Sequence, residues 1–285
     1  MKKILITGKH SYIGDSFAKW LEQWPDEYDV TKWSFKNDSW RERDFSQFDS
    51  VFNVAGIAHN SSDKELEDLY YKVNRDLAIE IAEKAKRDGV KQYIHMSSII
   101  VYGSKVNKIT AKTPFNPDNF YGDSKVQAEL GLNKIADENF KVAIIRPPMI
   151  YGENSKGNFP KLAELAKKTP IFPDYKNSRS VLYIDNLCEL VRLIVKTNEM
   201  GIFYPQMSEL VSSSEIVERV SFYTDHRIKF IKLFNPIISV LKNIELINKI
   251  FGDLYYDSSL SNNNLNYQIL NFNESINKIF SRGEE

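Results

Sequence analysis

The N-terminal half of the chain alternates short apolar runs with segments of helical periodicity, and this alternation limits the possible folds more than any other feature. Each apolar run has the length of a buried strand. Helix-period segments begin near Tyr12, Lys64 and Tyr121. Such alternation is typical of a parallel sheet that helices cover on both faces, which is a doubly wound α/β fold. The predicted strands are Lys3–Ile6, Val30–Phe35, Ser50–Val54, Gln92–Met96 and Lys141–Ile145.

The second half of the chain has a looser pattern, which prolines and clustered asparagines interrupt. We expect a smaller domain of mixed structure there, with one return of the chain to the sheet through a strand at Val181–Ile184. The predicted boundaries are 1–150 for the sheet domain, with a return near 179–198, and 151–178 with 199–285 for the smaller domain.

The charges exclude some classes of partner and site. The 38 basic and 38 acidic residues balance and form no long basic run, so we expect no nucleic acid as a partner. Four scattered histidines and the single Cys188 have no zinc-ligand spacing, so no metal site is expected either. Cys188 lies in an apolar pattern and is predicted as a core residue.

The apolar stretches of the sequence are too short for a membrane-spanning segment. The first apolar run, Ile4–Ile6, is too short for an export signal. The stretch Phe234–Ile250 is interrupted by polar residues and fits an amphipathic helix on a core or on a partner. The sequence therefore predicts a cytoplasmic protein with no integral membrane segment.

A glycine-bearing loop, Thr7–Gly14, follows the first predicted strand and precedes a helix. Gly8 is placed where the backbone must turn tightly, and Gly14 where the helix must pack against the strand. Ser11 stands at the middle position, which is usually glycine, and is small enough for a phosphate to approach. A lone loop of this kind also fits an ordinary strand–helix turn, but its place at the first strand favours a dinucleotide pyrophosphate at the helix N-terminus.

The end of the second strand indicates which dinucleotide is bound. An acidic residue there would bind the ribose hydroxyls and repel a 2′-phosphate, but the position holds Ser34. Basic residues surround it, which favours NADP(H) slightly over NAD(H), although they also fit a solvated face: Lys32, Lys36, Arg41 and Arg43. We expect Asp44 and Phe45 near the adenine, and Ala55 with Gly56 close to the cofactor.

A strand-end serine and a Tyr-x-x-x-Lys pair supply the candidate chemistry. Ser98 follows the fourth strand, and Tyr121 and Lys125 share one face of a helix because they are four residues apart. A cation about 4 Å from the phenol, at an effective dielectric near 20, is worth about 4 kcal/mol, or about 3 pK units. Lys125 is therefore expected to lower the pKa of Tyr121 toward neutrality, where the phenol can exchange a proton with substrate.

With these elements in this order, the chain resembles the extended short-chain dehydrogenases/reductases of the nucleotide-sugar epimerase/dehydratase family. The matching pieces are the Thr7–Gly14 loop, Val73-Asn74, Ser98 before Ile99–Gly103, and Tyr121 with Lys125. Later segments look like the branch that makes capsule and O-antigen precursors, and most closely like the reductases that form UDP-N-acetylfucosamine: Arg146–Gly152, Lys156–Phe159 and Arg179–Leu187.

The resemblance implies a Rossmann-type dinucleotide-binding domain at 1–150, a smaller C-terminal substrate domain, and a UDP-sugar substrate. The implied catalytic residues are Ser98, Tyr121 and Lys125, and Ser98 and Tyr121 would also bind substrate together with Asn158 and Arg179. The implied cofactor-binding residues are Gly8, Ser11, Tyr12, Ile13, Gly14, Ser34, Asp44, Phe45, Ala55, Gly56, Asn74, Tyr121, Lys125 and Pro148. The family also suggests a homodimer through helices near Lys64–Asp88 and Tyr121–Ala136.

Departures from the family pattern reduce the number of reactions that the chain is expected to catalyse. Dehydratases carry an Asp-Glu pair directly after the strand-end residue, where this chain has Ile99 and Ile100. Many 4-epimerases carry an asparagine where this chain has Met149. The sequence therefore favours reduction of the 4-keto group of a UDP-4-keto-6-deoxy-N-acetylhexosamine, with a nucleotide-sugar 4-epimerase as the alternative. A non-catalytic dinucleotide-binding protein is disfavoured because Ser98, Tyr121 and Lys125 are all present.

Overall fold

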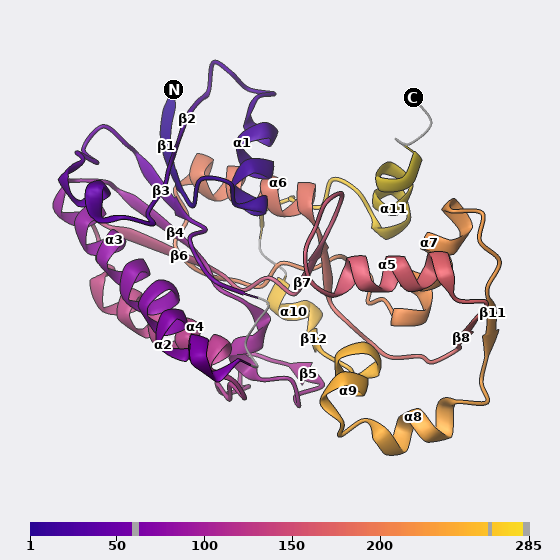
Figure 1. The fold of residues 1–285 in the computed structure, drawn as a ribbon. Helices are drawn as coiled ribbons and strands as arrows, with labels where there is room; N and C mark the ends of the chain where they lie inside the picture. Colours follow the sequence, from indigo (N-terminus) through magenta and orange to yellow (C-terminus); the bar gives the residue numbers. More distant parts are fainter. Residues whose placement is uncertain (59–62, 262–263, 282–285) are drawn as a thin grey trace.

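A computed structural model describes residues 1–58, 63–261 and 264–281 of the chain. Its centre is a six-stranded sheet in the order β10-β6-β4-β3-β1-β2 (Figure 1), and all of its strand pairs are parallel. The strands are β1 (Lys2–Thr7), β2 (Tyr28–Trp33), β3 (Ser50–Asn53), β4 (Gln92–Met96), β6 (Lys141–Ile145) and β10 (Gly201–Phe203). The predicted doubly wound α/β fold is therefore confirmed.

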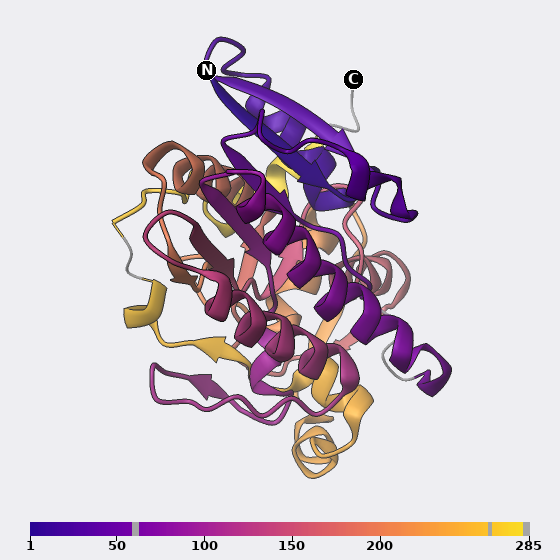
Figure 2. The ribbon, with the colours of Figure 1, turned by 90° about the vertical axis from the view of Figure 1, so that its left-hand side faces the viewer.

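The sheet separates two apolar layers, because successive side chains of a strand point to opposite faces. In β1, Ile4 and Ile6 belong to one buried cluster and Leu5 to the other. Helices α1 (Tyr12–Leu21) and α6 (Ile184–Thr197) cover the first face. Figure 2 looks onto the second face and shows α3 and α4 in front of the strands. The helices of this face are α2 (Glu67–Tyr70), the π-helix η3 (Tyr71–Asp76), α3 (Leu77–Arg87) and α4 (Phe120–Ile135).

The predicted return of the chain to the sheet is wrong in its position. Strand β9 (Val181–Tyr183) pairs with β7 (Met149–Tyr151) in a separate two-stranded sheet. The later strand that joins the main sheet is β10, beside β6, and it falls in the range that we had assigned to the smaller domain. Two of its three residues are exposed, so it carries no apolar run that sequence could reveal.

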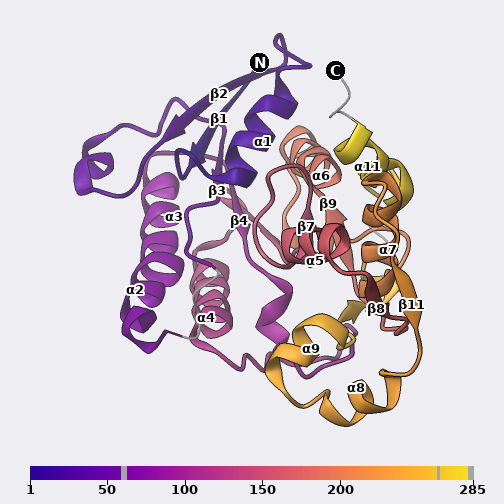
Figure 3. The same cartoon turned by 45° about the vertical axis from the view of Figure 1, so that its right-hand side comes forward.

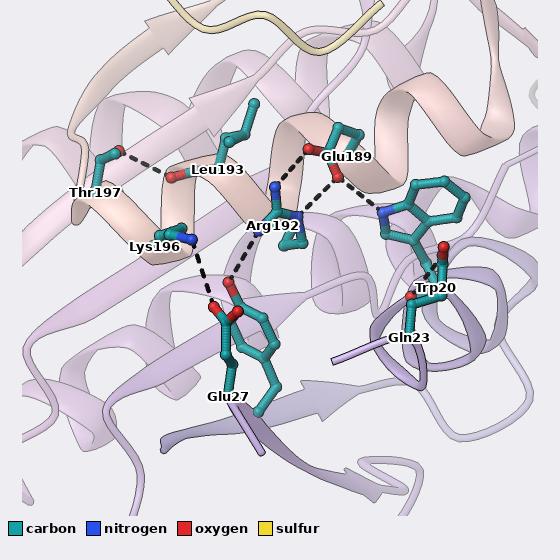
Figure 4. Close-up of polar contacts among 9 residues, drawn as sticks. Trp20, Gln23, Glu27, Glu189, Arg192, Leu193, Lys196 and Thr197 are labelled. Carbon is teal, nitrogen blue, oxygen red and sulfur yellow. Dashed lines mark hydrogen bonds and ion pairs between the residues drawn. The ribbon is translucent and has the colours of Figure 1, made fainter. Parts of the chain in front are cut away.

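The helix between these strands, α6, attaches the second half of the chain to the first (Figure 4). Trp20 Nε1 donates a hydrogen bond to Glu189 at 3.0 Å, and Arg192 pairs with the same carboxylate at 2.6 Å. Arg192 also donates to the Tyr28 hydroxyl at 3.4 Å and stacks on the Trp24 ring. Glu189 and Arg192 are both buried, so this polar cluster is enclosed where α6 meets the N-terminal segment.

The remaining elements form the smaller region, which lies beyond one end of the sheet in Figure 3. Its helices are α5 (Asn158–Lys168), α7 (Ser213–Tyr223), α8 (Asn235–Leu241), α9 (Glu245–Phe251), α10 (Ser258–Ser261) and α11 (Phe272–Phe280). Its short strand pairs are β8 (Ile171–Pro173) with β11 (Lys229–Ile231), and β12 (Tyr255–Tyr256) with β5 (Lys108–Ile109). Short 3₁₀ turns are η1 (Asp38–Glu42), η2 (Lys64–Leu66) and η4 (Ile99–Tyr102). Among the described helices, none is long and apolar enough to cross a lipid bilayer.

Candidate active site and cofactor cleft

The loop between β1 and α1 has the geometry that its glycines predict. Gly8 has a φ of 82°, which favours glycine, and a Cβ on it would lie 3.4 Å from the backbone nitrogen of Ala55. A Cβ on Gly14 would lie 3.0 Å from Ile6 and 3.1 Å from Val54, so α1 packs tightly on β1 and on the end of β3. Ser11 caps the helix, because its Oγ accepts from the backbone nitrogen of Gly14 at 3.3 Å.

The residues of this loop fit a dinucleotide pyrophosphate. The N–H groups of Tyr12 and Ile13 lie in the first turn of α1, where they have no partner within the helix and can bind an anion. Thr7, which the sequence argument did not single out, joins the ends of two strands. Its hydroxyl accepts from the backbone nitrogens of Val54 and Ala55, each at 3.1 Å.

The end of β2 is open, but most of its basic residues are already engaged. Ser34 is exposed directly after the strand. Three of the four basic neighbours are held by other side chains: Lys32 by Asp15 at 2.8 Å, Arg41 by Asp38 and Glu80, and Arg43 over the Trp33 ring at 4.8 Å. Lys9, which we did not predict, lies beside them because its backbone nitrogen donates to Trp33 O at 3.1 Å. Lys36 and Lys9 are therefore the lysines best placed to meet a ribose phosphate.

The expected adenine contact of Phe45 and of Asp44 stays a prediction, but only the side chain of Asp44 is accessible. That residue is exposed, and hydrogen bonds from Ser46 lower the pKa of its carboxyl. The Phe45 ring is fully buried against Trp33, Phe35 and Trp40. The Phe45 ring therefore has no exposed face. The reason is that the aromatic run around it builds the second core layer.

Ala55 and Gly56 do lie beside the candidate catalytic groups. A Cβ on Gly56 would come within 3.1 Å of Asn74 Oδ1 and 3.5 Å of Lys125 Nζ. Asn74 is buried in the π-helix η3, a helix type that is frequent at functional sites. Its amide exchanges two hydrogen bonds with the backbone of Ile57, at 2.8 and 3.0 Å, and donates to Ser124 Oγ at 3.3 Å.

The catalytic tyrosine candidate, Tyr121, is the second residue of helix α4. Its N-cap is Asn119, whose side chain accepts from Gly122 N at 2.9 Å. Gly122 lets the helix approach η4, because a Cβ there would lie only 2.9 Å from Ile100 O. This contact holds the first turn of α4, with Tyr121, against the segment that follows Ser98.

The Ser98 side chain hydrogen-bonds the Tyr121 phenol, a contact that the sequence argument did not include. However, the expected lowering of the tyrosine pKa is not found. Burial raises the pKa of Tyr121, and the hydrogen bond to Ser98 offsets this only in part. Lys125 does not act on the phenol here because its ammonium donates to Met96 O at 2.7 Å. The same burial lowers the pKa of Lys125 to about 8, against the attraction of Glu129.

Glu129 extends the functional face of α4 by one turn, and we did not predict its role. Tyr121, Lys125 and Glu129 follow one another at intervals of four residues, and all three contact the end of β4. Tyr121 bonds Ser98, Lys125 bonds Met96 O, and Glu129 accepts from the Ser97 hydroxyl. The helix and the strand end are therefore joined at three consecutive residues.

Arg146 neutralises Glu129 in the interior. Its Nε lies 3.1 Å from each oxygen of that carboxylate, and its Nη2 donates to Oε2 at hydrogen-bond distance. The guanidinium also donates to the hydroxyls of Tyr102 and Tyr204 and lies over the Phe115 ring. A buried ion pair needs such additional hydrogen bonds to offset desolvation. The spacing of Glu129, four residues after Lys125, could have indicated from sequence that it shares the helix face of Lys125. Nothing in the sequence indicated that Arg146, 17 residues further on, is its partner.

The predicted substrate residues lie on separate elements. Asn158 begins α5 directly after Gly157, whereas Pro148, which was predicted to bind the cofactor, is buried after β6. Arg179 is half-buried, and its Nη1 donates to the backbone oxygens of Gly252 at 2.9 Å and Asn248 at 3.4 Å, at the end of α9. The Nη1 atom of this guanidinium is thus already hydrogen-bonded within the protein. Ile99 and Ile100 occupy η4 and offer no acid–base group beside Ser98.

In the described part of the chain, no group of three or more His, Cys, Asp or Glu residues could hold a metal ion. Independently of that, the site brings one hydroxyl, one phenol and one ammonium together at the carboxyl ends of parallel strands. Ligands of open α/β sheets bind at that edge.

Comparison with known proteins agrees with this geometry. The model of the NAD-dependent epimerase/dehydratase family matches residues 4–203. A UDP-glucose 4-epimerase of Vibrio cholerae is 30% identical over 236 residues, which are 76% of this chain and 71% of that protein. An N-acetyl-alpha-D-glucosaminyl-diphospho-ditrans,octacis-undecaprenol 4-epimerase of Escherichia coli O157:H7 is 33% identical over 160 residues, 54% of this chain and 47% of that protein.

Solved structures share the whole fold at low identity. A dTDP-4-dehydrorhamnose reductase of Clostridium acetobutylicum has a TM-score of 0.77 at 16% identity and covers 99% of this chain and 100% of its own. The UDP-glucuronic acid 4-epimerase of Bacillus cereus, solved with UDP-glucuronic acid and NAD, has a TM-score of 0.77 at 18% identity and covers 98% of both chains. The family match, the epimerase relative and the shared fold lead to one conclusion: this chain belongs to the NAD-dependent epimerase/dehydratase family of extended short-chain dehydrogenases/reductases.

Proposed function

We propose that the protein reduces the 4-keto group of a UDP-4-keto-6-deoxy-N-acetylhexosamine, in the cytoplasm, to make a precursor of capsule or O-antigen polysaccharide. The observation that carries the proposal is the Ser98–Tyr121 hydrogen bond with Lys125 one turn away on α4. Bound nicotinamide would supply the hydride. Ser98 would polarise the ketone, and Tyr121 would give its proton to the sugar oxygen.

The remaining residues of the site take supporting roles in this proposal. Lys125 would hold the nicotinamide ribose after its ammonium leaves Met96 O. Asn74, which donates to Ser124 Oγ, would support the proton relay that returns a proton to Tyr121. Asn158, and the guanidinium nitrogens of Arg179 other than Nη1, would bind the nucleotide diphosphate. Dehydration is disfavoured because Ile99 and Ile100 cannot move protons.

A 4-epimerase is the second candidate, and the sequence relatives favour it. The Vibrio cholerae protein, 30% identical over 76% of this chain, bears the name of a UDP-glucose 4-epimerase. The same Ser98, Tyr121 and Lys125 would then work in both directions, with the sugar turning between oxidation and reduction. Met149, where many 4-epimerases have asparagine, favours the reductase.

NADP(H) remains our proposed cofactor, although most of the basic residues near Ser34 are paired. Lys36 and Lys9 are exposed beside Ser34 and could receive a 2′-phosphate. We also propose a homodimer through α2 and α4, because Leu69 and Leu130 are exposed on these helices. Its check is the mass of the purified protein in solution.

The direct test mixes the purified protein with NADPH and UDP-2-acetamido-2,6-dideoxy-4-hexulose and follows the nicotinamide absorbance. We expect stoichiometric loss of NADPH and one new 6-deoxy-sugar. No loss with either NADPH or NADH, from folded protein, would reject the reductase. Interconversion of UDP-N-acetylhexosamines without added cofactor would then support the epimerase.

A further inference from the structure

An apolar surface covers α8 and α9 and has no part in the candidate site. Among the described residues, seven of the eighteen large hydrophobic side chains that are exposed fall between 233 and 246. Leu233, Ile237 and Val240 are 77%, 58% and 78% exposed. We call this surface the α8–α9 face, and it consists of Leu233, Phe234, Ile237, Val240, Leu241, Ile244 and Leu246. Seven exposed apolar side chains within one short stretch of chain are typical of an interaction site.

Basic residues outnumber acidic residues in the segment that carries the α8–α9 face. Residues 227–250 contain five basic residues and only one acidic residue, although the whole chain is neutral. Lys232 and Lys242 each lie 3.7 Å from an aspartate of a neighbouring segment, and Lys249 lies 2.6 Å from Glu245. These pairs reduce the local charge but leave the side chain of Lys232 76% exposed. Arg227 and Lys229 are also exposed.

A hollow of about 500 Å³ lies at the edge of the α8–α9 face. Two of its lining residues, Asn235 and Ser239, belong to α8, and Lys176 and Lys232 add positive charge. Asp174 also lines it and is the partner of Lys232. Asn235 Oδ1 is buried there and has no hydrogen-bond partner in the described structure. The hollow therefore offers ammonium, amide and hydroxyl groups next to an apolar surface.

The shape of this region suits a flat partner. Helix α8 lies at the outer end of the smaller region in Figure 1 and Figure 3, on the side away from the sheet. The orange segment of Figure 2 likewise projects beyond the rest of the molecule. A projecting, apolar and basic surface matches the boundary between lipid headgroups and acyl chains, where amphipathic helices bind.

We propose that the α8–α9 face binds the surface of an anionic membrane. Leu233, Ile237 and Val240 enter the headgroup–acyl boundary, and the lysine side chains extend toward lipid phosphates. A second copy of the chain fits less well. In a two-fold symmetric dimer, the α8–α9 face of one copy would contact the same face of the other copy. The basic residues beside the two faces would then lie opposite one another.

This binding would hold the candidate site close to the bilayer. Helix α9 ends at the backbone oxygens that accept from Arg179, and Asn248 in the same helix donates to Ser104 O at 2.8 Å, shortly after Ser98. The membrane inference is independent of the proposed reaction, because it rests on exposed side chains outside the site.

Flotation of the full-length protein with lipid vesicles tests the inference. We expect binding to vesicles with about one third phosphatidylglycerol, little binding to pure phosphatidylcholine, and weaker binding as salt increases. The double variant Leu233→Ser/Val240→Ser should reduce the bound fraction about tenfold or more, because two exposed apolar anchors are lost. The matched control is Met200→Ser/Phe222→Ser, which removes two apolar side chains that are 52% and 74% exposed elsewhere.

Equal loss of binding in the control variant would overturn the proposal, as would equal binding to neutral and anionic vesicles. Absence of vesicle binding, together with dimers that only Leu233→Ser/Val240→Ser dissociates, would instead assign the face to a second copy. Absence of both would reject an interaction of either kind. Circular dichroism of each variant confirms that the fold is intact.

Discussion

The side chains of Tyr121, Lys125 and Glu129 show how one helix face serves catalysis and structure together. Their spacing of four residues places them in line along α4, and each contacts one residue at the end of β4. Burial disfavours the charged form of both Tyr121 and Lys125. In this arrangement the phenol is protonated, which is the state that a proton donor to a ketone requires.

Replacement of Tyr121 by phenylalanine should abolish most turnover without unfolding the protein. We expect a loss of about 100-fold or more in kcat, the lower range of general acid–base catalysis, with little change in melting temperature. Tyr71→Phe is the matched control, because its hydroxyl bonds only Asp123, at 2.7 Å, on the outer side of η3. Full activity in Tyr121→Phe, or an equal loss in Tyr71→Phe, would contradict the assigned role.

Lys125 should make stability depend on pH. Its folded pKa of about 8 lies below its usual value of 10.5, so the unfolded chain binds more protons between these values. Below pH 8 both states are protonated and the full cost of the buried cation applies. Between pH 8 and 10.5 the wild type should therefore gain free energy of unfolding relative to Lys125→Met. Urea unfolding at pH 7, 8, 9 and 10 measures this gain, and the exposed Lys72→Met is the control for loss of charge.

At the scale of elements, glycines decide how closely the helices approach the sheet. Gly14 brings α1 against β1 and β3, and Gly122 brings α4 against η4. The sequence identified the first of these because its loop has a recognisable pattern, and missed the second because a glycine inside a helix has none. The π-helix η3 was also missed, although its Asn74 was identified by family resemblance.

The end of β2 should control the choice of dinucleotide. Ser34→Asp places a carboxylate where a 2′-phosphate would lie, so we expect weaker NADPH binding, by about tenfold or more, and NADH binding that is unchanged or stronger. Titration of both cofactors by fluorescence measures the ratio. Ser208→Asp adds the same charge on an exposed residue of the smaller region and is the control. An unchanged ratio in Ser34→Asp would show that this position does not read the ribose.

At the scale of the whole molecule, one buried cluster joins both halves of the chain. It contains residues from Ile4 in β1 to Ile276 in α11, and α6 ties it to the N-terminal segment through Trp20, Glu189 and Arg192. The apolar core is therefore not divided at the predicted boundary at residue 150.

This continuity predicts cooperative unfolding. All four tryptophans lie within residues 20–40, so tryptophan fluorescence reports only the N-terminal segment, whereas far-ultraviolet circular dichroism reports the whole chain. We expect the urea transitions of the two signals to coincide. A fluorescence transition at clearly lower urea would mean that the N-terminal strands unfold separately from the rest.

The sequence by itself determined the doubly wound sheet, the loop that fits a dinucleotide, and the order of Ser98, Tyr121 and Lys125, because apolar periodicity and four-residue spacing are local properties. Tertiary structure alone decided that β10 forms the edge of the sheet beside β6, that Arg146 pairs with Glu129, and that Phe45 is buried. It also decided the pKa of Tyr121, because burial and the competing bond from Lys125 to Met96 depend on segments brought together only by folding.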